Sequence, residues 1–175
     1  MKIPSSRNPN FTSSINPLQT SSINPARTSS INPHRTSSIN PFRTSSINPM
    51  RTSSINPSRT SSINPFRTSS LNPNRTSSKN PSRTSSVNPY QSSNVAGKYI
   101  FNLDLQPIGF TVQANENVIL IFDLQLNWRA FGVSNKKSGF NVFSLNGEWV
   151  EFWVSNRKEN YNIFTVDGDW VSFTS

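Results

Sequence analysis

The sequence predicts an all-β domain preceded by a long repetitive tail, and three observations lead to this prediction. The octapeptide Thr-Ser-Ser-Ile-Asn-Pro-x-Arg recurs in ten copies over residues 12–91. A different unit recurs four times, at a spacing of 21, between residues 98 and 175. Residues 1–93 hold eleven Lys and Arg and no acidic residue, whereas residues 94–175 hold all eight Asp and Glu. Because each array has its own period and composition, we divide the chain into a tail, 1–93, and a β domain, 94–175.

The octapeptides predict a tail without helices and without a globular core. Proline lacks an amide hydrogen and moves the preceding Asn out of the α region, so each Asn-Pro pair favours a turn and Thr-Ser-Ser-Ile an extended piece. One reliable apolar residue in eight is too few to offset an ordering cost of roughly 1–2 kcal/mol per residue. The seventh position of the repeat is too varied for a packed interior: Leu18, Ala26, His34, Phe42, Met50, Ser58, Phe66, Asn74, Ser82 and Tyr90. We expect a disordered or loosely turned tail, with a thin β-solenoid as the alternative.

The charge of the tail predicts multivalent contact with a polyanion, either a nucleic acid or an anionic surface. Intermittent Phe42, Phe66 and Tyr90 could stack on bases. A soluble, charged spacer is the other interpretation, because one arginine per octapeptide is a low density for a nucleic-acid arm. The residues expected to contact the polyanion are Arg27, Arg35, Arg43, Arg51, Arg59, Arg67, Arg75 and Arg83.

The second half repeats in several apolar columns at a spacing of 21. Phe101, Phe122, Phe143 and Phe164 form one column. Nine residues after each of them stand Phe110, Phe131, Phe152 and Phe173. Six residues after it stand Pro107, Trp128, Trp149 and Trp170. Agreement in this many columns indicates four copies of one structural unit.

Each unit is typical of a β-hairpin. Asn146-Gly147 and Asp167-Gly168 favour a two-residue turn between alternating apolar stretches, which would pair Phe143 with Val150 and place Trp149 on the opposite face from Phe143. The first two units have Asp104-Leu105 and Gln125-Leu126 instead. Since a Leu at positive φ would be strained, we expect their turns to differ.

Hairpins of this size are not stable alone, so the four are expected to pack around a pseudo-fourfold axis in a small flower- or propeller-like array. The repeated aliphatic-Phe-x-Leu, Asn/Asp-Gly, Trp and Phe pattern resembles the bacterial domain called the four-fold β-flower. The resemblance covers about residues 96–175 and implies a fold rather than an activity. The octapeptide tail has no counterpart in that family.

No residue pattern predicts catalysis, a metal or a cofactor. The chain has no cysteine and a single histidine, His34, which occupies a variable position of the octapeptide. Two carboxylate pairs, Asp167 with Asp169 and Glu148 with Glu151, flank turns, where solvated acids are common, and a general acid needs a buried setting. The sequence therefore predicts a protein that is not an enzyme.

The tryptophans are the candidate ligand- or partner-binding residues of the β domain. Trp128, Trp149 and Trp170 could line a binding surface for carbohydrate or peptide, although repeated aromatics are more often core residues. Trp153 breaks the repeat, since Thr111, Gly132 and Thr174 hold the equivalent positions. It is either an exposed anchor for a partner or a filler for the space that its small neighbours leave.

The sequence as a whole predicts a non-enzymatic interaction or scaffold protein, with a multivalent basic tail and a β module that binds a protein partner or another copy of itself. A structural fibre or surface stalk built from stacked or glycosylated octapeptides is the first alternative, and a carbohydrate- or peptide-binding module that uses the tryptophan columns is the second. Neither a secretory signal nor a membrane span is recognisable, so a cytoplasmic location is the default expectation.

Overall fold

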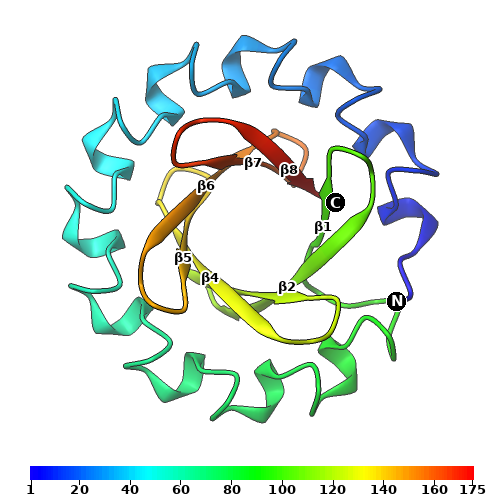
Figure 1. Cartoon of the computed structure of the whole chain (residues 1–175), viewed down its shortest axis with the longest axis vertical. Helices are drawn as coiled ribbons and strands as arrows, with labels where there is room; N and C mark the ends of the chain where they lie inside the picture. The colour runs from blue at the N-terminus through cyan, green and yellow to red at the C-terminus, as the bar shows by residue number, and fades with distance from the viewer.

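The computed structural model describes residues 1–175 as two concentric layers, a central β-barrel and an outer ring of short turns (Figure 1). The barrel is closed and antiparallel, and its eight strands pair in chain order until β8 pairs with β1. This confirms the all-β prediction. The strands are β1 (Tyr99–Asn102), β2 (Pro107–Asn115), β3 (Val118–Asp123), β4 (Trp128–Ser134), β5 (Gly139–Ser144), β6 (Trp149–Ser155), β7 (Tyr161–Thr165) and β8 (Trp170–Thr174).

Each hairpin carries a β-bulge one residue after its tryptophan-column position. In β5–β6, Phe143 lies opposite Trp149, and Val142 lies opposite Glu151, so Val150 is the extra residue. The predicted pairing of Phe143 with Val150 is therefore wrong. An extra residue in one strand moves the side chains on one side of the bulge to the opposite face of the sheet. Trp149 therefore lies on the outer face of the barrel, as Phe143 does. Register shifts occur at the equivalent step of the other three hairpins.

The four hairpin turns are alike, which corrects the expectation that the first two would differ. All are three-residue loops that end in a residue with positive φ: Leu105 at 61°, Leu126 at 66°, Gly147 at 85° and Gly168 at 95°. Such loops place a left-handed residue at their third position. Leucine is strained there, but Leu105 and Leu126 pack against the apolar cluster between barrel and ring, and this burial offsets the strain.

Phenylalanines cover the outer face of the barrel as four stacked pairs. Each pair joins neighbouring hairpins, with ring centroids 5.5–5.9 Å apart: Phe101–Phe173, Phe110–Phe122, Phe131–Phe143 and Phe152–Phe164. Stacked aromatic pairs contribute beyond the area that they bury. The barrel thus has an apolar exterior, which requires a cover.

The octapeptides supply that cover, with two tight turns in each. The first is a short 3₁₀ helix over Ser-Ser-Ile, and the second follows Asn-Pro, where the Asn carbonyl accepts the amides three and four residues later. The predicted Asn-Pro turn is confirmed, whereas the extended Thr-Ser-Ser-Ile is wrong. The 3₁₀ helices are η1 (Ser5–Arg7), η2 (Ser13–Ile15), η3 (Ser21–Ile23), η4 (Ser29–Ile31), η5 (Ser37–Ile39), η6 (Ser45–Ile47), η7 (Ser53–Ile55), η8 (Ser61–Ile63), η9 (Ser69–Leu71), η10 (Ser77–Lys79) and η11 (Ser85–Val87).

Side chains link each octapeptide to the one before it. Ten Thr hydroxyls, from Thr12 to Thr84, donate to the carbonyl of the Ser seven residues earlier. Seven Asn amides donate to the Pro carbonyl seven residues earlier, as Asn40 does to Pro33 at 2.9 Å. The Asn Oδ1 atoms accept the amide two residues later, as in Asn40 and Phe42. These bonds satisfy the backbone of a segment that has neither strand nor long helix.

The expectation of a disordered tail without a globular core is wrong, because the octapeptides bury their fourth, fifth and sixth positions on the barrel. Ile47 and Ile55 are each 1% exposed, and every proline of the eleven Asn-Pro pairs is buried. Ile55, Ile63 and Leu71 belong to the same apolar cluster as the barrel phenylalanines. The varied seventh position lies at the edge of this interface, where Phe42 and Met50 are about half exposed.

The chain runs around the ring and around the barrel in opposite senses, and three octapeptides of the ring correspond to one hairpin of the barrel. Asn162 donates to the carbonyl of Ile23 and Asn141 to that of Ile47. The two ring residues are 24 positions apart and the two barrel residues are 21 apart. Phe42 and Phe66, also 24 apart, stack on Trp149 and Trp128 at centroid distances of 5.1 and 5.0 Å. Three octapeptides of the ring thus cover the arc of one hairpin of the barrel.

The ring closes beside its own start, where the N-terminal segment meets the chain leading into β1 (Figure 1). The Lys2 amide donates to the Pro89 carbonyl. Arg7, which stands in the Ile column, donates to the carbonyls of Val95 and Gly97 and lies 4.6 Å from the Tyr99 ring centroid. Burial lowers the pKa of the Arg7 guanidinium, and Tyr99 opposes this effect. The helices of the chain are three-residue 3₁₀ turns, and none of them could span a membrane.

Candidate functional site

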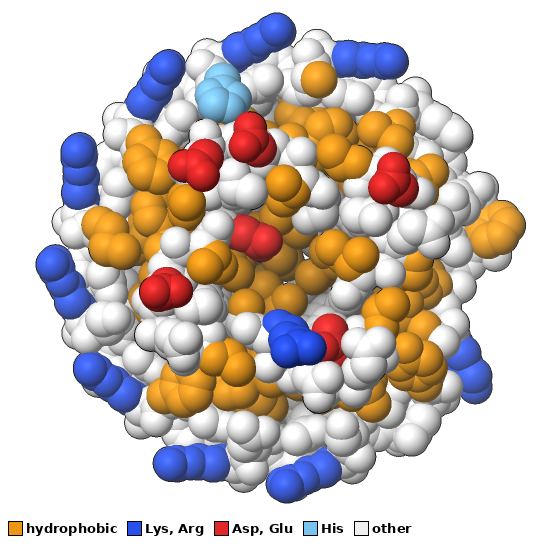
Figure 2. All heavy atoms as spheres, viewed as in Figure 1, with side chains coloured by type: hydrophobic (Ala, Val, Ile, Leu, Met, Phe, Trp, Pro, Cys, Tyr) orange, Lys and Arg blue, Asp and Glu red, His pale blue; other side chains and the backbone are white.

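The arginines of the octapeptides form a belt on the circumference of the ring. All eight, from Arg27 to Arg83, are exposed, and Figure 2 shows basic side chains spaced around the outer edge. They stand outside because Ile, Asn and Pro of the same octapeptide turn toward the barrel. The belt is therefore a consequence of the eight-residue period.

The arginine belt keeps most of its hydrogen-bonding capacity. Five of its arginines donate one side-chain hydrogen bond within the ring, such as that of Arg67 to the Ser58 carbonyl at 3.1 Å. None is ion-paired, because the single salt bridge of the protein joins Arg129 and Asp123 in the barrel. Since a guanidinium has five N–H donors, each belt arginine can still bind an external anion.

The acidic residues are segregated from the belt. Asp104, Asp123, Glu148, Asp167 and Asp169 lie at the hairpin turns, and on the face in Figure 2 acidic side chains lie over the barrel rather than at the edge. The loops at the opposite end of the barrel carry Lys136, Lys137, Arg157 and Lys158 together with Glu116 and Glu159, so their net charge is positive. The positive charges of the ring thus have no acidic partner, and the two ends of the barrel carry net charges of opposite sign.

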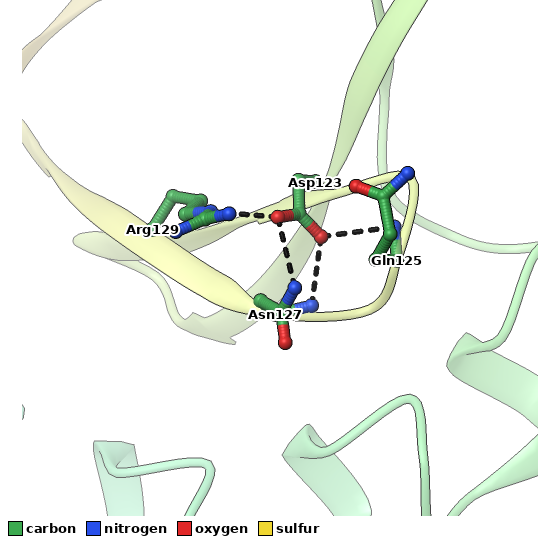
Figure 3. A network of polar contacts seen from close by, with 4 residues as sticks. All are labelled: Asp123, Gln125, Asn127 and Arg129. Atoms are coloured by element: carbon green, nitrogen blue, oxygen red, sulfur yellow. Dashed lines mark hydrogen bonds and ion pairs between the residues drawn. The ribbon is translucent and has the colours of Figure 1, made fainter.

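One polar network fixes the turn between β3 and β4 (Figure 3). The Asp123 carboxylate accepts the amides of Gln125 and Asn127 at 2.9 Å, the Asn127 side chain at 3.1 Å and Arg129 Nε at 2.6 Å. Desolvation raises the pKa of Asp123, but the hydrogen bonds from Asn127 and Arg129 outweigh it and lower the pKa below its usual value. Every oxygen of this carboxylate is committed to the turn.

The three tryptophans of the repeated column lie under the ring. Trp128 is 9% exposed beneath Phe66, and Trp149 is partly covered by Phe42. Their indole N–H groups donate to the carbonyl two residues later, as does that of Trp170. The ring thus occupies much of the surface that a carbohydrate or peptide would use.

Trp153 lies inside the barrel, so the expectation of an exposed anchor is wrong. It is 1% exposed and packs with Val142 and Ile163, side chains that point inward. Thr111, Gly132 and Thr174 at the equivalent positions are small and leave the space that its indole fills. The filler interpretation of Trp153 is the one that the packing supports.

Glu151, which the sequence analysis treats as a solvated acid near a turn, lies in the mouth of the barrel two residues before Trp153. Its Oε2 accepts the Trp153 Nε1–H at 3.2 Å. Burial raises the pKa of Glu151, and the bond from Trp153 acts in the opposite direction. The signal was present in the repeat, because the equivalent residues are Gly109, Ala130 and Ser172.

No three His, Asp or Glu side chains lie close enough together to hold a metal ion. His34 Nε2 lies 2.9 Å from the Gly168 carbonyl oxygen at the ring–barrel boundary, which is a structural contact. Comparisons with protein-family models, with curated proteins and with solved structures found nothing that matches this chain.

Proposed function

We propose that the protein is a non-enzymatic binding scaffold that holds a flexible polyanion along the arginine belt. The observation that carries the proposal is the belt itself: eight exposed arginines at a fixed period, unpaired and apart from the acidic residues. A pre-ordered array loses less conformational entropy on binding than a disordered tail would. Many weak contacts along one polymer then add up to a useful affinity.

The shape of the belt favours a linear polymer over a planar anionic surface. A convex circumference presents only a few of its arginines to a flat membrane, whereas a flexible chain can follow it around the ring. Phe42, Phe66 and Tyr90 stand one residue before an arginine or, for Tyr90, before Gln91. The rings of Phe42 and Phe66 stack on barrel tryptophans, and about half of each residue is exposed. Aromatic side chains beside cationic ones suit the bases of a single-stranded nucleic acid.

The experiment uses substitutions that the ring already contains. Gln19 and Gln91 occupy the arginine position of their octapeptides, so replacing Arg43, Arg51, Arg59 and Arg67 by Gln should preserve the fold. We expect salt-dependent binding of single-stranded oligonucleotides, with the slope of log K against log salt reduced by up to about 0.7 per arginine lost. Four changes to Gln in the exposed barrel loops, at Lys136, Lys137, Arg157 and Lys158, are the matched control. Equal losses in both variants, or binding without salt dependence, would contradict the proposal.

The barrel is proposed to be a pseudo-fourfold, flower-like array of four copies of one hairpin, as the resemblance to the β-flower implies. The four turns end in a residue with positive φ, the four bulges occupy equivalent positions, and four phenylalanine pairs join neighbouring hairpins. These features support the proposal.

A second candidate function, stacking into a fibre, is favoured by the opposite charge of the two barrel ends. Acidic hairpin turns at one end could meet the basic loops of the next copy, and such a head-to-tail contact does not close on itself. Sedimentation velocity at low salt would detect it. A Lys136→Glu, Lys137→Glu variant should then remain monomeric while still binding oligonucleotide.

A further inference from the structure

A small cavity of about 160 Å³ opens at the hairpin-turn end of the barrel. Its lining includes Ile100, Ile121 and Ile163 together with Glu151, which the register places at the same level of the barrel, and Trp153, two residues further along β6. In Figure 2 apolar side chains surround a hollow near the centre of this face. Most of its lining is apolar, and its three ionisable residues are Glu151 and the ion pair of Asp123 and Arg129.

The cavity exists because the hairpin repeat is broken at two inward positions. Gly109, Ala130 and Ser172 leave room where Glu151 projects, and Trp153 fills the lumen two residues further along β6. A sequence that only needed a packed lumen would place another apolar residue at position 151. A carboxylate there costs desolvation free energy unless a charged partner compensates it.

No side chain of the protein supplies that compensating charge. Glu151 has a single side-chain hydrogen bond, from the neutral indole of Trp153. Arg129 lines the same cavity, but its guanidinium is paired with Asp123 at 2.6 Å. No hydrogen bond or ion pair joins Arg129 to Glu151, so this carboxylate has no ionic partner within the protein.

The cavity opens at the end of the barrel that carries the hairpin bulges, and two bulge residues, Ile108 and Arg129, line it. The bulge residues of the four hairpins are Ile108, Arg129, Val150 and Val171. The three aliphatic ones are 45%, 37% and 38% exposed. Exposed aliphatic side chains around an opening favour entry of a ligand with a hydrocarbon body over entry of a strongly hydrated metal ion.

We propose that the mouth of the barrel binds a small organic ammonium ion, whose charged group pairs with Glu151 and whose compact hydrocarbon body contacts the isoleucines and Trp153. Two features set the ligand class. A cavity of about 150 Å³ lined by apolar side chains accepts benzene, which limits the body to roughly six to eight non-hydrogen atoms. The indole face adds an attraction for the cation.

The test is a titration of the full-length protein with benzylamine and isoamylamine, followed by tryptophan fluorescence and by calorimetry. Their neutral counterparts, benzyl alcohol and isoamyl alcohol, have the same shape without the charge. We expect saturable binding of the amines and at least tenfold weaker binding of the alcohols. Equal affinity for amine and alcohol would overturn the role of the carboxylate, and no saturation at millimolar amine would overturn the site.

Variants separate the charge from the cavity. Glu151→Gln keeps the side-chain volume and should weaken amine binding at least tenfold, while Glu148→Gln, on the exposed turn of the same hairpin, should leave it unchanged. Unaltered binding in Glu151→Gln would refute the assignment. The amine titrations of these two variants do not involve the arginine belt. A negative result would therefore refute the amine site and leave the polyanion proposal intact.

The unmodified protein offers a second readout that needs no variant. Lowering the pH protonates Glu151 and should release the amine. The other ionisable groups facing the cavity are Asp123 and its ion-pair partner Arg129. The pKa of Asp123 is lowered, so the release should precede the titration of Asp123 as the pH falls. Amine affinity that stays constant from neutral pH down to pH 4 would contradict the proposal.

Discussion

Replacing Ile55 by Ala tests whether the octapeptide ring and the barrel fold as one unit. Ile55 is 1% exposed and belongs to the apolar cluster that contains the barrel phenylalanines. Substitution of a buried Ile by Ala removes transfer free energy and leaves a cavity, at a cost of about 2–5 kcal/mol. Total stabilities of domains are about 5–15 kcal/mol, so the effect should be large.

The assay is urea denaturation followed by tryptophan fluorescence, because all four tryptophans lie in residues 128–170 of the barrel. With a slope of about 2 kcal/mol per molar urea, Ile55→Ala should lower the midpoint by about 1–2.5 M. Ser58→Ala, at an exposed position of the next turn, is the control and should change stability by less than about 0.5 kcal/mol. If Ile55→Ala left the barrel transition unmoved, the octapeptides would not share a core with it.

Three further changes probe other parts of the account. Asn141→Ala leaves the buried Ile47 carbonyl without its donor and should cost about 1–3 kcal/mol in the same denaturation assay; an effect near zero would mean that the ring carbonyl finds another partner. Arg7→Ala removes the bonds to Val95 and Gly97 and should cost about 1.5–3 kcal/mol, with faster hydrogen exchange in the first octapeptides, whereas Arg27→Ala should do neither. Because burial raises the pKa of Glu151 in the folded state, that state binds more protons than the unfolded chain. Stability should therefore fall as the pH rises above about 4.3 through the folded pKa, and Glu151→Gln should remove this fall; an unchanged pH profile in the variant would refute the assignment.

The barrel was largely predictable because its signals are local. The columns led by Phe101 and Phe110 predicted β structure, and Asn146-Gly147 predicted a turn. The register was not predictable to the residue, since the bulge at Val150 has no marker in a sequence where every neighbour is apolar. The turn geometry at Leu105 was missed because tertiary packing overrides the local cost of a positive φ.

The ring was mispredicted because its stabilisation is not local. Each octapeptide has one consistently apolar residue, Ile55 or its equivalent. Burial of this residue alone does not offset the conformational entropy lost when the octapeptide is ordered. What orders it is a surface supplied by a distant part of the chain, the phenylalanine pairs of the barrel, together with Thr and Asn bonds between successive repeats. Neither the exterior of the barrel nor these links between repeats can be read from composition.

The same reasoning explains why the candidate sites changed. Trp153 was singled out correctly as a break in the repeat, but an unusual residue in a column can face inward as well as outward, and the facing depends on the register. Glu151 breaks the repeat two residues earlier and was overlooked as one of the solvated acids near a turn. The arginines predicted to contact a polyanion are the exposed residues of the belt, but their regular arrangement around a ring could not be predicted from the sequence.

Small-angle X-ray scattering of the full-length protein tests the central claim most directly. A single compact body of 175 residues should have a radius of gyration of about 16 Å and a scattering profile typical of a folded particle. A barrel with residues 1–93 unfolded should be far larger, since such a segment alone has a radius of gyration of about 30 Å. The compact radius is the result that the ring-and-barrel architecture predicts, and a radius approaching that of the unfolded segment would contradict it.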